Sequence, residues 1–255
     1  MRAAVLLVLY ILIVIAVTPI VLACLITGMR EPLMLIGKGA MAVGRAILGI
    51  KLEVKGLDLL EREKAYLFMA NHESFLDGPL LFYVIPRLPR VILKKSVFRI
   101  PVLGQGMRHV GFVPVDRKGV RGGKASIDLA SRLIRERGYS FLIFPEGTRS
   151  LDGRIQAFRR GGFFLALAGG TPIVPISING TFELMPKGSF KIGKGRVGVL
   201  FHPPVAPDGY DRGNMEGLMA KVKAAIESGL DRPGPAESAA GASPSGEVLQ
   251  GGTHD

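Results

Sequence analysis

The chain has 255 residues, of which 48% are hydrophobic and one is a cysteine, and its formal net charge is +12. A single cysteine excludes an intramolecular disulfide, and no Cys/His cluster has the spacing of a zinc site. The positive charge favours an anionic partner, either nucleic acid or anionic lipid. The chain lacks Trp and has no Lys/Arg-rich block with interleaved aromatic residues. We therefore expect membrane phospholipids as partners and no nucleic acid.

The N-terminus is a long apolar segment. Residues 3–29 include no charged side chain, and at about 1.5 Å per helical residue they can cross a hydrocarbon core of about 30 Å. We expect residues 1–29 to form a transmembrane or membrane-anchoring helix. Only Arg2 precedes the segment, whereas several basic residues follow it. This bias predicts a cell inner membrane location with the bulk of the chain, the domain that follows this segment, facing the cytoplasm.

A secretory signal is the alternative to this anchor. Residues 21–24 loosely resemble a lipoprotein processing box that ends at Cys24. The apolar run is longer than the usual signal core of about 7–15 residues, and it continues past Cys24. We therefore expect Cys24 to be a small apolar residue that faces lipid.

Residues 30–50 predict a second helix. Glu31, Lys38 and Arg45 are spaced seven residues apart and share one helical face, while apolar residues cover much of the rest. This pattern is typical of a juxtamembrane amphipathic helix in the membrane interface. A helix packed on the main domain would show the same pattern, and the glycines in the segment weaken any helix. Both interpretations stay open.

Short apolar runs alternate with helical patterns through residues 51–232. We expect strands at 52–54, 66–70, 91–93, 111–115, 140–144, 173–178 and 197–201, and helices at 78–84, 124–137, 161–168 and 215–228. The alternation predicts an α/β domain with a mainly parallel central sheet flanked by helices. Such sheets bind ligands at the carboxyl ends of their strands. Residues 233–255, rich in Pro, Gly, Ser and Ala, predict a disordered tail.

A histidine, His72, follows the strand expected at 66–70, and an aspartate, Asp77, comes five residues after it. A carboxylate that binds one ring nitrogen of a histidine fixes its tautomer and makes it a general base near neutral pH. Ser74 and Asp77 also fit a capping box, with Ser74 as N-cap. That box alone would explain both residues, but it leaves His72 unexplained. Asp77 could do both jobs, capping with one oxygen and holding the imidazole with the other.

A second polar segment, Phe-Pro-Glu-Gly-Thr-Arg-Ser at 144–150, also follows an expected strand. Arg149 can hold a phosphate or carboxylate through two parallel hydrogen bonds, and Glu146 would orient Arg149 or bind a substrate hydroxyl. An ordinary turn with an exposed salt bridge is the alternative. Further basic pairs lie at strand ends or near a helix start, where they favour anions. These pairs are Lys94-Lys95, Arg117-Lys118 and Arg159-Arg160.

Four segments, in this order, resemble the glycerolipid acyltransferases, the family that includes bacterial 1-acylglycerol-3-phosphate acyltransferase. Residues 71–77 look like the His-x4-Asp block of that family. Residues 111–117 resemble its second block, which ends in arginine, and residues 144–150 match its third block fully. Residues 174–176, Val-Pro-Ile, resemble its short fourth block. The resemblance spans about residues 51–201.

The resemblance implies acyl transfer from acyl-CoA or acyl carrier protein to the free sn-2 hydroxyl of lysophosphatidic acid, giving phosphatidic acid without a metal or other cofactor. His72 would be the general base, and Asp77 would orient it. Val174, Pro175 and Ile176 would line the acyl-donor site. The implied substrate-binding residues are Glu146, Gly147, Thr148, Arg149, Arg117, Lys94 and Arg159.

Other functions remain open. The acceptor could be another lysolipid, such as a lyso-ornithine lipid or a different lysophospholipid. A hydrolase could use the same base to activate water, but Ser74 is a poor nucleophile candidate because it fits a helix cap two residues from His72. A non-catalytic lipid-binding protein would use the basic surface, but it would give no reason for His72 and Asp77 together.

Overall fold

The computed structural model describes residues 2–115, 120–189 and 191–231, and a seven-stranded sheet forms its centre. The sheet order is β1-β7-β6-β2-β5-β3-β4. Neighbouring strands are parallel throughout, except that β6 and β7 are antiparallel. The predicted α/β class with a mainly parallel sheet is confirmed. The strands are β1 (Ile50–Lys55), β2 (Leu67–Ala70), β3 (Arg90–Lys94), β4 (Val113–Val115), β5 (Phe141–Ile143), β6 (Ile173–Asn179) and β7 (Gly195–Phe201).

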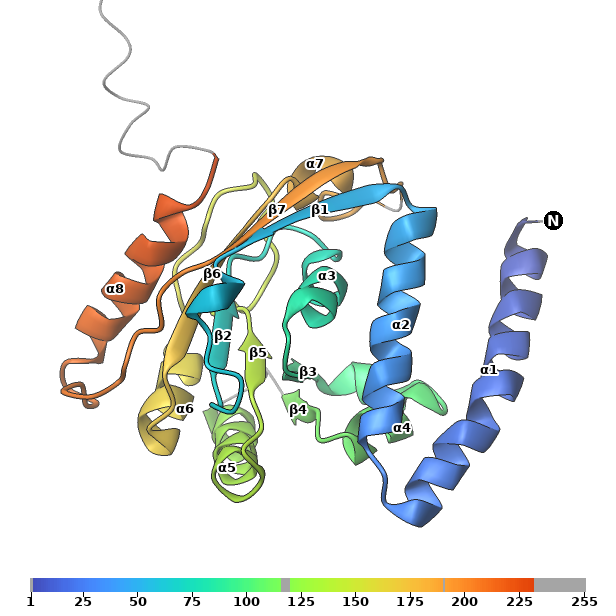
Figure 1. Ribbon diagram of the computed structural model, residues 1–255, viewed down its shortest axis with the longest axis horizontal. Coiled ribbons are helices and arrows are strands. Elements are labelled where there is room, and N and C mark those ends of the chain that lie inside the picture. The colour runs from blue at the N-terminus through green and yellow to red at the C-terminus, as the bar shows by residue number, and fades with distance from the viewer. Residues whose placement is uncertain (1, 116–119, 190, 232–255) are drawn as a thin grey trace, which may run out of the picture.

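Helices cover both faces of the sheet (Figure 1). The four helices expected in the main domain are present, and the short α4 and α7 were not predicted. The helices are α1 (Arg2–Thr27), α2 (Glu31–Ile47), α3 (Asp77–Val84), α4 (Leu103–His109), α5 (Val120–Arg137), α6 (Gly161–Gly169), α7 (Thr181–Leu184) and α8 (Met215–Ser228). Two 3-10 turns, η1 (Leu57–Leu59) and η2 (Lys95–Arg99), complete the described elements. The tail expected at 233–255 lies outside the described residues.

Strand β2 shows how the core is divided. Its four side chains are all buried, because successive side chains point to opposite faces and both faces are covered. Phe68 and Ala70 belong to the core layer that includes α3. Leu67 and Met69 belong to the opposite layer, with α5, α6 and α8. The sheet therefore holds the loops at its carboxyl edge on a rigid base.

The N-terminal helices lie beside this domain, with α1 standing outside α2 (Figure 1). Among the described residues, no helix combines the length and the apolar character needed to cross a membrane. The predicted membrane-spanning segment therefore stays a prediction. The part of it that the structure describes includes Cys24, which is buried rather than facing outward, so the expectation that Cys24 faces lipid is wrong.

Helix α2 turns its basic residues toward the domain. Lys38 Nζ donates to the carbonyl of Ile85 at 2.9 Å, and Arg45 donates to the carbonyl of Ile50 at 2.8 Å. Burial lowers the pKa of Lys38. Apolar residues of the same helix point outward instead, with Val43 60% and Ile47 78% exposed. The helix thus packs on the domain and also presents an apolar surface, so the two interpretations of residues 30–50 are compatible.

Candidate active site

Two loops at the carboxyl edge of the sheet form the site. Strands β2 and β5 are parallel neighbours, with Leu67 opposite Phe141. The loop after β2 carries His72, and the loop after β5 carries residues 144–150, so both leave the same edge. The backbone N–H of Ser150 donates to the carbonyl of His72 at 2.8 Å. The topology therefore explains why two segments that are distant in the sequence meet here.

His72 and Asp77 are in direct contact, as the sequence predicts. The Nδ1 atom of His72 lies 2.9 Å from Oδ2 of Asp77. The same Oδ2 accepts the backbone N–H groups of Glu73 and Ser74, both at 2.8 Å. The Asp77 side chain is fully buried, whereas the His72 side chain is 19% exposed. A carboxylate held by two backbone donors fixes the imidazole with Nδ1 protonated, which leaves the lone pair of Nε2 available.

The expected capping box is formed in part: Asp77 accepts the backbone N–H of Ser74, but the Ser74 hydroxyl accepts the N–H of Leu76 rather than that of Asp77. Helix α3 begins at Asp77, with Leu76 as the N-cap and no side-chain cap. The Ser74 hydroxyl donates to the carbonyl of Met185 at 2.8 Å and accepts the N–H of Leu76. Asp77 does not divide its oxygens between two jobs either, because Oδ2 takes all three donors and Oδ1 is buried without a partner. The tight turn at 73–76 brings the donors to one side of the carboxylate.

Phe144 supports the other side of the imidazole. Its ring is stacked on His72, with the ring centroids 4.0 Å apart and the planes inclined by 17°. Because Asp77 holds the ring at one edge and Phe144 covers one face, the imidazole has little rotational freedom. Phe144 was not among the predicted site residues. The sequence signal that could have identified Phe144 as a site residue is its position directly before the Pro-Glu-Gly-Thr-Arg segment.

Glu146 lies inside the protein, contrary to the expectation that it orients Arg149 or binds a substrate hydroxyl. It is 2% exposed. Oε1 accepts the backbone N–H of His72 at 2.7 Å, and Oε2 accepts the N–H of Gln156 at 2.9 Å. Burial raises the pKa of this carboxyl to about 7, against the opposing effect of the two backbone donors. Glu146 therefore joins the His72 loop to the loop at 156.

Two arginines line the same cavity as the histidine. Arg149 and Arg159 both line it together with His72. Gly147 makes the arrangement possible: its φ is +72°, and a Cβ at this position would lie 2.8 Å from Cδ and Nε of Arg159. The turn therefore needs glycine for its backbone and for the passage of the Arg159 side chain.

The remaining predicted ligands lie elsewhere. Lys94 is exposed at the end of β3 and does not line this cavity. The hydroxyl of Thr148 lies 3.4 Å from Nζ of Lys187, a residue outside the predicted site. Arg117 lies outside the described residues. The structure thus brings together His72, Arg149 and Arg159, and leaves Lys94 apart from them.

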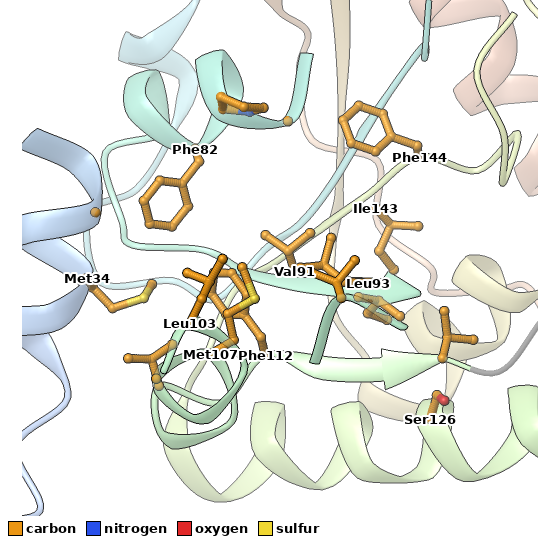
Figure 2. Close-up of a pocket in the computed structure, with 18 of the residues that line it drawn as sticks. Met34, Phe82, Val91, Leu93, Leu103, Met107, Phe112, Ser126, Ile143 and Phe144 are labelled. Carbon is orange, nitrogen blue, oxygen red and sulfur yellow. The ribbon is translucent and has the colours of Figure 1, made fainter. Parts of the chain in front are cut away.

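The cavity has a volume of about 890 Å³ and is mainly apolar. This size falls toward the upper end of the range of about 300–1,000 Å³ for ligand pockets. Figure 2 shows Met34 from α2, Phe82 from α3 and Leu103 from α4 pointing into it. His72 and the arginines occur in its lining with these apolar residues, so a histidine held by a carboxylate and a large apolar space share one cavity.

Val174, Pro175 and Ile176, expected at the acyl-donor site, do not line this cavity. They lie in the middle of β6, paired with Phe68, Met69 and Ala70 of β2. Val174 and Ile176 are completely buried in the core layer that includes α3. A central strand between two others is covered on both faces, so these side chains stabilise the sheet. Within the described residues, no group of three or more His, Cys, Asp or Glu side chains could hold a metal ion.

Comparisons with known proteins find similar acyltransferases. A family model described as Acyltransferase matches residues 51–179, about half of the chain. A chloroplastic 1-acyl-sn-glycerol-3-phosphate acyltransferase of Brassica napus is 37% identical over 157 residues, which are 61% of this chain and 45% of that protein. A 1-acyl-sn-glycerol-3-phosphate acyltransferase of Borreliella burgdorferi is 35% identical over 136 residues, 53% of this chain and 54% of that protein. The chain thus spans about half the length of these curated relatives.

A solved structure is similar over nearly the whole chain. It is the crystal structure of the 1-acyl-sn-glycerophosphate acyltransferase PlsC from Thermotoga maritima, with a TM-score of 0.71 and 26% identity. The match covers 90% of this chain and 96% of that one. The matched residues 51–179 include His72, Asp77 and the whole 144–150 segment. The chain belongs to the Acyltransferase family.

Proposed function

We propose that the protein transfers a fatty acyl group from an acyl thioester to the free sn-2 hydroxyl of lysophosphatidic acid, giving phosphatidic acid. One observation carries the proposal: a carboxylate-held histidine shares an apolar cavity of about 890 Å³ with two arginines. Such a cavity suits an acceptor that has a reactive hydroxyl, an anionic group and a hydrocarbon chain. The names of the relatives from Brassica napus and Borreliella burgdorferi support lysophosphatidic acid as that acceptor.

His72 would act as the general base. With Nδ1 protonated and bound to Asp77, Nε2 accepts the proton of the acceptor hydroxyl as its oxygen attacks the thioester carbonyl carbon. The carbon–sulfur bond then breaks, and the imidazolium returns the proton to the leaving thiolate. The Asp77 carboxylate stabilises the imidazolium between these two steps. The reaction balances without an acyl-enzyme intermediate.

Arg149 and Arg159 would hold the acceptor phosphate. Both lie in the lining of the cavity that contains His72. A guanidinium offers parallel N–H donors that match the oxygens of a phosphate. A pair of cations in the same cavity as the base would fix the glycerol unit with its hydroxyl toward Nε2, while the chain of a lipid substrate occupies the apolar part.

The outward side chains of the N-terminal helices support a membrane location. Ile26 on α1 is 85% exposed, and Val43 and Ile47 on α2 are similarly open. An apolar face of this kind marks an interaction surface rather than a solvated one. We propose that it anchors the protein to the cytoplasmic face of the inner membrane, where the lysolipid is found. The cavity reaches α2 through Met34 and Gly37, so it lies next to the proposed lipid surface.

A transfer assay tests the function. Purified protein in lipid vesicles is given lysophosphatidic acid, other lysophospholipids or a lyso-ornithine lipid, each with acyl-CoA or acylated acyl carrier protein. We expect transfer to lysophosphatidic acid, and no transfer by His72→Ala with folding intact. Preferred transfer to another lysolipid would identify a different acceptor. Absence of transfer with every pair would leave a lipid-binding role and refute the enzymatic one.

A further inference from the structure

Lys187 lies beyond the segment that matches the family model, which ends at residue 179. It occupies the second position of a tight turn in which the N–H of Ser189 donates to the carbonyl of Pro186 at 3.0 Å. Gly188, at the third position, has a φ of +93°, as a type II turn requires. The turn therefore gives Lys187 a defined backbone position after α7.

The Lys187 side chain returns to the loop that carries Arg149. Its Nζ donates to the backbone carbonyl of Arg149 at 3.0 Å and lies 3.4 Å from the Thr148 hydroxyl. The next backbone N–H, that of Ser150, donates to the carbonyl of His72 at 2.8 Å. The peptide group between Arg149 and Ser150 is thus held at its carbonyl by Lys187 and at its N–H by the His72 backbone.

The turn itself is fixed to the His72 loop. The Ser74 hydroxyl donates to the carbonyl of Met185 at 2.8 Å, and Ser74 and Pro186 form an isolated antiparallel bridge. The turn that carries Lys187 is therefore bonded to the loop of the proposed base, His72. Lys187 thus connects the loop that carries Arg149 with the loop that carries His72 through contacts that do not involve the sheet.

The charge of Lys187 is directed at backbone and hydroxyl oxygens. Among the residues that the structure describes, Lys187 takes part in no ion pair with a carboxylate. Its side chain is half-buried, so its hydrogen bonds are only partly replaced by water when they are lost. A hydrogen bond from a charged donor is stronger than one between neutral groups.

From these contacts we infer that Lys187 is a positioning residue of the acceptor site, which sets the Arg149 backbone relative to His72. The inference rests on the proposed function. Lys187 acts through Arg149, so its loss weakens the binding of the acceptor's anionic group in the ground state and transition state alike. Such a loss of uniform binding raises KM and leaves kcat nearly unchanged.

The test compares four substitutions in the full chain, assayed in vesicles with lysophosphatidic acid and with the donor, acyl-CoA or acylated acyl carrier protein, that the wild-type protein uses in the transfer assay. Lys187→Met should raise the acceptor KM roughly tenfold, with kcat and donor KM changed by less than about twofold. Lys187→Gln keeps a neutral donor and should give an intermediate KM. Lys187→Arg should restore most of the affinity. Lys191→Met, at an exposed lysine of the same segment, is the matched control and should behave as wild type.

An unchanged acceptor KM in Lys187→Met overturns the inference, and so does an equal rise in donor KM. A fall in kcat without a rise in KM also overturns it. If Lys187→Met does not fold, the comparison of Lys187→Gln with Lys187→Arg decides by the same criteria. Wild-type protein that transfers nothing to lysophosphatidic acid refutes the proposed function, and that result is seen before any variant is examined.

Discussion

Replacing Glu146 by Gln should change how the stability of the protein depends on pH. Glu146 accepts the backbone N–H groups of His72 and Gln156 while it is buried. A glutamine side chain has the same shape, but its amide nitrogen cannot accept a hydrogen bond, so one of the two N–H groups loses its acceptor. This loss costs about 1–3 kcal/mol and is independent of pH.

The ionisation of Glu146 contributes a second effect of comparable size. Burial raises its pKa in the folded protein to about 7, from an ordinary value of 4.5. Between these pH values the folded state binds more protons than the unfolded state, so the free energy of unfolding falls as pH rises and levels off above about pH 7. At about 1.36 kcal/mol per pH unit, the loss is on the order of 3 kcal/mol. The Glu146→Gln variant would show no such dependence at this position, because an amide does not titrate.

The two effects are separated by measuring both proteins in detergent with urea at about pH 5 and pH 8. We expect Glu146→Gln to be less stable than wild type at the lower pH and about as stable at the higher one. The stability difference between the two proteins should shift by about 2–3 kcal/mol over this range. Glu63→Gln, at an exposed carboxylate, is the control and should show no shift. A difference for Glu146→Gln that stays constant with pH would refute the reasoning.

Three further predictions concern the reaction and the membrane. Asp77→Asn should lower kcat by roughly 10²–10⁴-fold, because an amide cannot hold His72 with Nδ1 protonated as the carboxylate does; retained turnover would contradict the assigned role. Arg149→Ala should raise the acceptor KM far more than the donor KM, whereas the exposed Arg154→Ala should change neither, and the reverse pattern would speak against Arg149 as phosphate ligand. Val43→Asp should reduce binding to anionic vesicles in a flotation assay by roughly tenfold, while Leu59→Asp, at another exposed apolar residue, should not; equal losses would exclude a specific α2 surface.

Most elements of the sheet could be predicted because their strands contain short apolar runs, whereas β1 alternates apolar and charged residues. The same pattern located the two loops at the carboxyl edge and the contact between His72 and Asp77. Helix α4 was not predicted because two glycines fall within its seven residues, and α7 has only four residues. Such short helices are formed by their surroundings rather than by their own periodicity.

The roles of single side chains were harder to predict than the elements. A sequence shows that Glu146 lies near Arg149, but it does not show that the turn at Gly147 sends the two side chains apart. In the same way, periodicity places Lys38 and Arg45 on one face of α2 without telling which face meets the domain. The fourth block looked like a ligand site, yet its residues 174 and 176 are core residues. These outcomes depend on packing between distant segments.

The mutual attachment of the two site loops has a consequence for specificity engineering. The His72 loop is held by its backbone N–H to Glu146 and by its backbone carbonyl to Ser150. Because these bonds use main-chain atoms of the His72 loop, exposed side chains at the rim can be exchanged without displacing the base. A library at the cavity rim could therefore be searched for acceptors with other head groups while the chemistry of proton transfer is kept.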